Sequence, residues 1–210
     1  MIECPILLNA TAVRAIRAGT KTQHRVAMKP QPADDIRPHR APNKSIQCWI
    51  SSLAHQHGTS TVHVCPYGQA GDRIWVRESW AVGKCADSLK PIMLHPGTWM
   101  VDNGGLWYPA DAAEPRNPIS PRGKTRPGMY MPRWASRIVL DVTEVRVQRL
   151  QDISEADAWC EGVDASEALS MGCSDGAVAV YSALWEKNNG ADSWDANPWV
   201  WAVEFRRIEP

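Results

Sequence analysis

SRIVLDVTEVRVQRL, residues 136–150, is the strongest strand signal in the chain. Ile138, Leu140 and Val142 alternate on even positions, and Val145 and Val147 continue the alternation on odd ones. An alternation with a period of two is typical of a β-strand that buries one face. A shift of one residue in that alternation indicates a β-bulge, here near Thr143 and Glu144. The stretch therefore predicts one long, bent strand of the kind that occurs in small barrels.

Shorter segments on both sides of this stretch have equally readable patterns. Runs of β-branched and aromatic residues predict strands, and capping residues next to apolar stripes predict helices. We expect strands at 73–80, 136–149 and 199–207 and helices near 11–18, 154–161 and 176–187. Because strands and helices do not alternate regularly, a parallel α/β fold is disfavoured. The predicted fold class is α+β, a small mixed or antiparallel β-barrel with flanking helices.

Two long regions interrupt this pattern. Residues 33–65 are rich in Pro, Asp, His and Ser, and residues 82–127 end in a basic stretch rich in Pro and Gly. Both are too long to be plain connections in a compact core, so we interpret them as inserted loop regions. The chain of 210 residues is predicted to be one domain, 1–210, that carries these two insertions.

Composition excludes several classes of protein. The chain has 23 basic and 23 acidic residues, so it lacks the excess of cations that a histone-like grip on nucleic acid needs. No apolar stretch is as long as a membrane span, and the start lacks the pattern of a signal peptide. The six cysteines contain no Cys-x-x-Cys motif and are expected to be reduced thiols. We expect a soluble protein of the cytoplasm that does not bind membranes.

The cluster Cys48, His55, His57, His63 and Cys65 has the residue types of a metal site. Its spacings match no common zinc motif, so we favour a His-rich loop and expect no metal and no cofactor.

Charge is unevenly distributed along the chain. Residues 1–50 have a net charge of +5 and residues 111–137 of +4, whereas residues 150–195 have −9. If the two basic segments share a face, a polynucleotide can lie across it. We expect Arg25, Arg77 and Arg133 to lie within one concave surface.

Several of these segments together resemble a known family. Residues 13–16 and 18–25, VRAI and AGTKTQHR, are similar to the opening motif of ASCH domains, a branch of the PUA-like fold in which a short helix ends in Gly-x-Lys-Thr. Residues 71–78, GDRIWVRE, resemble the next strand of that family, and residues 153–158 with Glu161 and Gly162 resemble its C-terminal half. Longer ASCH-containing proteins of phages and prophages share stretches like MPRWASRI at 131–138.

The resemblance implies a PUA-like pseudobarrel with a cleft beside the first helix. It also implies ligands that are RNA or modified nucleosides. Some members hydrolyse N4-acetylcytidine, and ribonuclease activity is described for others. Whether this chain is an enzyme stays open at this point.

Three residues are the candidates for catalysis. Lys21 stands in the Gly-x-Lys-Thr motif, and a Lys held in a cleft binds phosphate or a carbonyl oxygen, or acts as a base when desolvated. Glu161 matches the glutamate that the family's amidohydrolases use with their Lys, so we expect the two side chains to meet. His24 replaces the Thr that those enzymes use as the proposed nucleophile. An imidazole there serves as a general base, and the neighbouring Thr22 is displaced along the chain.

Guanidinium forks and aromatic planes near the predicted cleft suit the recognition of phosphates, carboxylates and bases. The candidate ligand-binding residues are Thr22, Arg25, Arg77, Glu78, Trp80, Arg133 and Trp134.

Three functions remain open. The first is a module that binds RNA or a modified nucleoside in the Lys21 cleft. The second is an amidohydrolase acting on N4-acylated cytidine, or a ribonuclease. The third is a phage protein that binds a host protein through its two insertions. The sequence does not indicate the oligomeric state.

Overall fold

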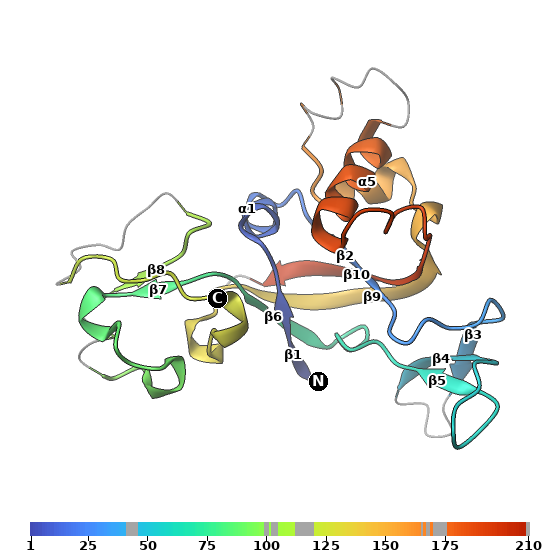
Figure 1. The fold of residues 1–210 in the computed structure, drawn as a ribbon, viewed down its shortest axis with the longest axis horizontal. Helices are drawn as coiled ribbons and strands as arrows, with labels where there is room; N and C mark the ends of the chain where they lie inside the picture. The colour runs from blue at the N-terminus through green and yellow to red at the C-terminus, as the bar shows by residue number, and fades with distance from the viewer. Residues whose placement is uncertain are drawn as a thin grey trace.

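The computed structural model describes residues 1–40, 46–98, 101, 105–111, 120–164, 166, 169 and 176–208. A central sheet forms the middle of the molecule, with α1 (Ala10–Ala18) and α5 (Gly176–Asn189) on the same side of it (Figure 1). One end of the elongated molecule holds a small sheet of β3, β4 and β5, and the other end holds β7 and β8 (Figure 1).

Five strands form the central sheet in the order β1-β6-β9-β10-β2. Their bounds are β1 Glu3–Leu7, β2 Gln23–Ala27, β6 Arg73–Arg77, β9 Val139–Arg149 and β10 Trp199–Ile208. β1 runs parallel to β6, and the other three pairings are antiparallel. The predicted strands and the mixed α+β class are therefore confirmed. The described strands form an open sheet with β1 and β2 at its edges, so the closed barrel that we expected is not formed among them.

The predicted β-bulge is confirmed at its predicted place. Glu204 of β10 pairs with Glu144, but the next residue, Phe205, pairs with Val142. Thr143 is therefore the extra residue of β9, and the apolar side chains on both sides of it face the same core.

The helices also lie where the caps placed them. Asn9 Oδ1 accepts a hydrogen bond of 2.9 Å from the Ala12 amide at the start of α1, and Gly19 ends that helix with φ of 78°. Ser154 caps α3, which spans Glu155–Cys160. α5 contributes Tyr181 and Trp185 to a second core between helices and sheet.

The expectation that 33–65 is a loop region is wrong, because this segment forms a three-stranded antiparallel sheet. Its strands are β3 Arg37–Arg40, β4 Gln47–Ser51 and β5 Thr61–His63. Trp49 of β4 packs edge-on against Trp201 of the central sheet, with ring centroids 5.0 Å apart. The strands are short and β3 contains Pro38 at the sheet edge, which hides the period-two signal.

The second insertion, as far as it is described, folds around its own core. It contains the paired strands β7 Ala81–Val82 and β8 Leu106–Trp107 and two single 3-10 turns, Lys84–Ala86 and Pro91–Met93. Further 3-10 turns follow at Gly128–Tyr130, Arg133–Ala135 and Leu150–Asp152. Trp80, Leu94 and Met131 form the centre of this third core. Within the described residues, no helix combines the length and the apolar character that a membrane crossing requires.

Candidate functional site

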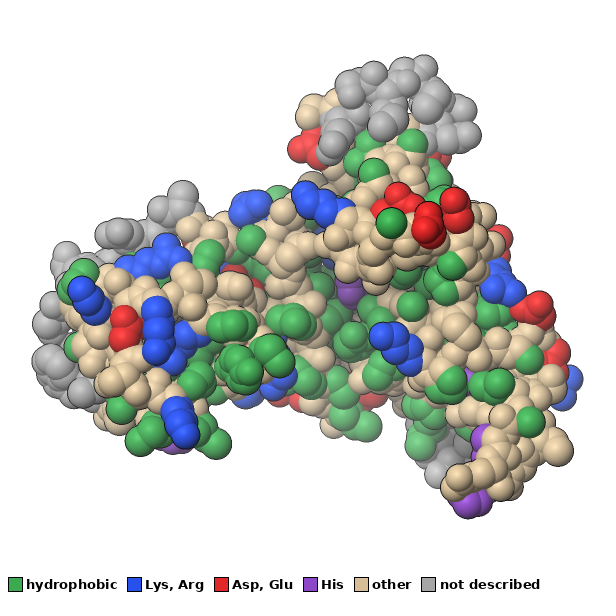
Figure 2. Space-filling view, viewed as in Figure 1, with side chains coloured by type: hydrophobic (Ala, Val, Ile, Leu, Met, Phe, Trp, Pro, Cys, Tyr) green, Lys and Arg blue, Asp and Glu red, His purple; other side chains and the backbone are tan. Residues whose placement is uncertain are grey.

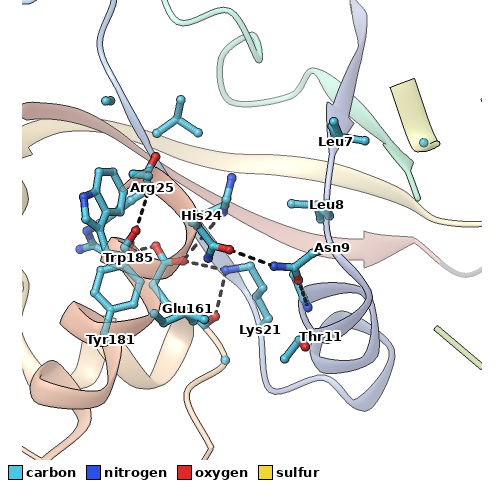
Figure 3. A pocket seen from close by; sticks show the side chains of 18 of the residues that line it. Leu7, Leu8, Asn9, Thr11, Lys21, His24, Arg25, Glu161, Tyr181 and Trp185 are labelled. Atoms are coloured by element: carbon cyan, nitrogen blue, oxygen red, sulfur yellow. Dashed lines mark hydrogen bonds and ion pairs between the residues drawn. The ribbon is translucent and has the colours of Figure 1, made fainter. Parts of the chain in front are cut away.

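A pocket of about 610 Å³ opens between α1 and α5. Its walls come from the junction of β1 and α1, from β2 and the residue Lys21 before it, from residues 127–129, from Glu161 and Gly162, and from the C-terminal turns of α5. In Figure 3, Lys21, His24 and Glu161 converge, with Asn9 on one side and Tyr181 and Trp185 on the other. This volume is within the range of pockets that hold small organic ligands.

Lys21 and Glu161 meet at this pocket, as predicted. Lys21 Nζ donates to Glu161 Oε2 at 2.7 Å and to the Glu161 carbonyl oxygen at 2.9 Å. The exposed fractions of the two side chains are 4% and 2%. A buried ammonium requires such a partner, because an unpaired charge in the interior is costly.

The backbone around this pair explains how residues so distant in sequence come together. The Thr22 amide donates to the Cys160 carbonyl oxygen at 2.8 Å, and Lys21 and Glu161 form an isolated β-bridge. Gly162 follows with φ of 81°, and a Cβ on it would lie 2.9 Å from the Cβ atoms of both Ala15 and Lys21. Only glycine therefore permits this close approach of the end of α3 to α1 and Lys21.

Arg25 extends the charged cluster behind the pair. Its Nη1 donates to Glu161 Oε1 at 3.1 Å, and its Nη2 lies 3.2 Å from Asp157 Oδ2. Burial by itself would raise the pKa of Asp157, but hydrogen bonds from Gln23 and Arg146 and the charges of both arginines outweigh it and lower the pKa to about 2. Glu161 is thus held between two cations, each of which bonds a different carboxylate oxygen.

His24 lies at the edge of the same cluster, as expected. Its Nδ1 is 4.0 Å from Glu161 Oε2, and its side chain is half-buried in the pocket wall. Desolvation lowers the pKa of His24 to about 3, and the charges of Lys21 and Arg25 contribute to the shift. The imidazole is therefore neutral at physiological pH and accepts a hydrogen bond or a proton on one ring nitrogen.

Aromatic residues of α5 form the opposite wall of the pocket. Tyr181 and Trp185 are both buried, with ring centroids 6.3 Å apart. Burial raises the pKa of Tyr181 well above its usual value; the nearby Glu161 carboxylate raises it further, and Arg25 opposes the shift. The helical spacing of these residues in the sequence predicts core packing, which is confirmed, but that pattern does not reveal that they also line a pocket.

The two candidate tryptophans lie elsewhere, which corrects their assignment to a ligand site. Trp80 is 0% exposed and packs edge-on against Trp134 at 6.1 Å in the core of the second insertion. Trp134 Nε1 donates to the Leu94 carbonyl oxygen at 3.0 Å. Neither residue lines the pocket, and Trp80 has no accessible surface for stacking. Trp80 belongs to the third core and Trp134 packs against it, so both stabilise this part of the fold.

Glu78, Arg77 and Arg133 also lie outside the pocket lining. Glu78 is buried and accepts two hydrogen bonds from Arg137, at 2.8 and 3.0 Å. The Arg77 guanidinium lies 4.6 Å from the centre of the Trp75 ring.

The expected concave surface of Arg25, Arg77 and Arg133 is therefore wrong. Arg25 is buried on β2, at the far edge of the sheet from β1, and its charge is used within the cluster. Arg133 is engaged by two hydrogen bonds of 2.9 Å to Glu3. Figure 2 shows Lys and Arg side chains over the end that holds β7 and β8, and Asp and Glu side chains near α5. Lys44 and Arg116 of the basic segments lie outside the described residues.

Thr22 is exposed and does not line the pocket, so it offers no hydroxyl to a ligand there. In the His-rich segment, His63 hydrogen-bonds Ser51 at 2.9 Å and the Cys48 thiol donates to the His39 carbonyl oxygen. Within the part of the chain that the structure describes, no three His, Cys, Asp or Glu side chains are grouped as metal ligands.

Asn9 and Asn188 are pocket residues that the sequence analysis missed. Asn9 Nδ2 donates to Asn188 Oδ1 at 3.4 Å, which joins the start of α1 to the end of α5 across the pocket rim. The helix cap at Asn9 is visible in the sequence, but no sequence pattern shows that two helices so far apart in the chain meet there.

No protein-family model, no curated protein and no solved structure matches this chain.

Proposed function

We propose that this protein binds a modified nucleoside in the pocket around Lys21. The observation that carries the proposal is a buried, internally neutralised charge cluster at the edge of a cavity of nucleoside size. Lys21 and Arg25 are matched there by Glu161 and Asp157, and His24 is neutral. Such a site favours a neutral ligand with hydrogen-bonding edges, such as a base, over a phosphate group.

The likeness of residues 13–25 and 153–162 to ASCH domains supports the same proposal, as does the expected PUA-like arrangement of a cleft beside the first helix. A base that projects from an RNA chain presents the same chemistry as a free nucleoside. The exposed Lys29 also lines the pocket and offers a cation to the backbone of such a chain. The cysteines that the structure describes are free thiols, which fits the cytoplasmic location that we propose.

Binding is tested with modified nucleosides and short RNAs, by calorimetric titration of the wild type and of Lys21→Met. This variant keeps the length of the side chain and removes the ammonium. We expect loss of nucleoside binding in Lys21→Met and unchanged binding in Lys90→Ala, which alters an exposed lysine outside the pocket. Equal affinity in wild type and Lys21→Met would contradict the proposal.

Amide hydrolysis is the second candidate, because Lys21, Glu161 and His24 meet at one edge of the pocket. In this reaction, the oxygen of a water bonds to the acyl carbon, the C–N bond breaks, and an acid and the parent amine are released. Two of the three Lys21 ammonium hydrogens bond Glu161, which leaves the third for the carbonyl oxygen of a substrate. The neutral His24 accepts the proton of the water.

Release of acetate from N4-acetylcytidine tests this candidate. We expect turnover in the wild type and a loss of about 100-fold or more in His24→Asn, as for removal of a general base. His24→Thr tests whether a hydroxyl at this position supports the reaction in place of the imidazole. Tight binding without release of acetate leaves the protein as a binding module only.

A further inference from the structure

The charge cluster does not account for the position of the Tyr181 side chain in the pocket wall. Its ring is buried, with 4% of the residue exposed, and packs against Trp185 and Trp194 at centroid distances of 6.3 and 6.2 Å. Its hydroxyl makes no hydrogen bond to any described residue. The hydroxyl oxygen is not among the fully enclosed side-chain atoms without a partner that the described residues contain, so it reaches accessible space, where water or a ligand can bond it. Because Tyr181 lines the cavity, the partner position for this hydroxyl is in the pocket.

The neighbouring Glu161 carboxylate is already engaged. Glu161 has both carboxylate oxygens bonded, one to Lys21 and one to Arg25. Because this carboxylate is taken up by Lys21 and Arg25, the Tyr181 hydroxyl keeps its hydrogen for a group in the pocket. Burial and the carboxylate of Glu161 keep its pKa raised, so the phenol retains its proton and acts as a donor.

We propose that the Tyr181 hydroxyl determines ligand specificity by donating a hydrogen bond to an acceptor oxygen of the ligand, such as the carbonyl oxygen of an acylated base. This inference rests on the proposed function, since it assigns one recognition contact within the same pocket. It adds a residue of α5 to a site whose charged members come from β2, from Lys21 shortly before β2 and from the end of α3.

A purely structural tyrosine behaves differently. The Tyr108 hydroxyl donates to the Ala135 carbonyl oxygen at 2.8 Å, so Tyr108→Phe removes a bond within the protein. Tyr181→Phe keeps the ring and its packing against Trp185 and removes only the hydroxyl that faces the pocket. If the residue serves packing alone, this substitution leaves ligand discrimination unchanged.

The experiment compares two probes that differ at one atom position. N4-acetylcytidine carries a carbonyl oxygen, and N4-ethylcytidine has a similar size without it. We expect the wild type to bind the acetyl probe about 3- to 10-fold more tightly than the ethyl probe, the range of one neutral hydrogen bond. Tyr181→Phe should lose this preference while its affinity for the ethyl probe stays unchanged. The control Tyr130→Phe alters an exposed tyrosine outside the pocket lining and should keep the preference.

The outcomes separate the two proposals. Binding of both probes by the wild type, with the same preference in Tyr181→Phe, overturns the role of Tyr181 and leaves the proposed function standing. A wild type without preference overturns it as well, even if the variant does not fold. Binding of neither probe overturns the proposed function, and the inference falls with it.

Discussion

Glu161 and Glu78 are both buried glutamates paired with arginine, yet their surroundings differ. Glu78 receives two parallel hydrogen bonds from Arg137, which also pairs with Asp111 and lies over the Tyr108 ring, 3.9 Å from its centre. Glu161 bonds one oxygen to Arg25 and the other to Lys21, and His24 stands beside it at the edge of a cavity.

A buried ion pair therefore does not by itself indicate a functional site. The Glu78 cluster continues through Asp111 to Arg17 of α1, so it ties the residues next to β6 and β9 to Asp111 and to that helix. The cations of the Glu161 cluster are buried more deeply than Arg137, and the cluster borders a pocket that a neutral imidazole and Tyr181 also line. We therefore expect variants of the two clusters to resemble each other in stability and to differ in binding.

Removal of either glutamate should have the largest effect. Glu161→Ala and Glu78→Ala each leave buried cations without their carboxylate, and we expect each to lower the free energy of unfolding by about 3–5 kcal/mol. Only Glu161→Ala should abolish nucleoside binding. Urea denaturation and calorimetric titration measure the two quantities, with the Gln variants for any Ala variant that does not fold. Loss of nucleoside binding in a folded Glu78→Ala variant would contradict the assignment of binding to the Glu161 cluster alone.

Gly162→Ala should have the next largest effect on stability. The new Cβ meets the Cβ atoms of Ala15 and Lys21 at 2.9 Å and takes a left-handed backbone conformation, φ 81°. Overpacking and backbone strain together predict a loss of about 2–4 kcal/mol in the free energy of unfolding.

The matched control is Gly190→Ala, where φ is 102° and the Cβ meets open space. This variant has the strain without the collision, so its loss should be about 1–2 kcal/mol. Equal losses in the two variants would show that the close approach at Gly162 does not hold Lys21 in place.

The lowered pKa of His24 should make the stability of the protein depend on pH. Its pKa in the folded protein is about 3, below the value of 6.5 for a free imidazole, so between these values the unfolded chain binds a proton that the folded chain does not. Stability therefore falls as the pH decreases through this range, by about 2 kcal/mol from this group between pH 7 and pH 5. Urea denaturation at both pH values should show a smaller fall in His24→Gln.

Burial also lowers the pKa of His63, which lies in the β3–β4–β5 sheet, far along the chain from the pocket. His63→Gln should therefore remove a separate part of the same fall, and the double variant should have the flattest profile. A His24→Gln variant with the full wild-type slope would contradict the neutral state of this imidazole.

Asn188→Ala should have the smallest effect. The bond from Asn9 is 3.4 Å long and exposed, so its loss should change the free energy of unfolding by about 0.5 kcal/mol or less. A drop of more than 1 kcal/mol by thermal denaturation would show that the rim, and not only the floor, holds α1 and α5 together.

The elements that the sequence predicted are those with strong periodicity or caps. The bulge at Thr143 follows from the shift between Val142 and Val145, and α1 follows from a cap at Asn9 or Thr11, of which the structure shows Asn9, and from Gly19 at its end. The three-stranded sheet within 33–65 was missed, because β3 and β5 are only four and three residues long and β3 contains Pro38. The meeting of Lys21 and Glu161 was predicted from the family resemblance and not from any pattern of spacing.

The site was harder to predict than the fold. A tryptophan that stacks on a ligand and one that fills a core have the same side chain, and only the packing of the second insertion shows that Trp80 is buried. Tyr181 was assigned to the core, which is correct for its ring. Tyr181 also lines the pocket because α5 lies beside the end of α3, a tertiary contact that a helical stripe does not encode.

The strand order β1-β6-β9-β10-β2 has a consequence for synthesis on the ribosome. The first 27 residues contribute both edges of the sheet, but β2 is held there by β10, residues 199–208. The intervening chain offers β2 no partner in the central sheet. The segment with Lys21 and His24 therefore stays unpaired in this sheet while some 170 further residues are synthesised. A nascent chain that lacks β10 already contains Lys21, His24 and Glu161, but β2 is not yet paired in the sheet and the pocket is not yet formed. The protein therefore becomes able to bind a ligand only when β10 has been synthesised.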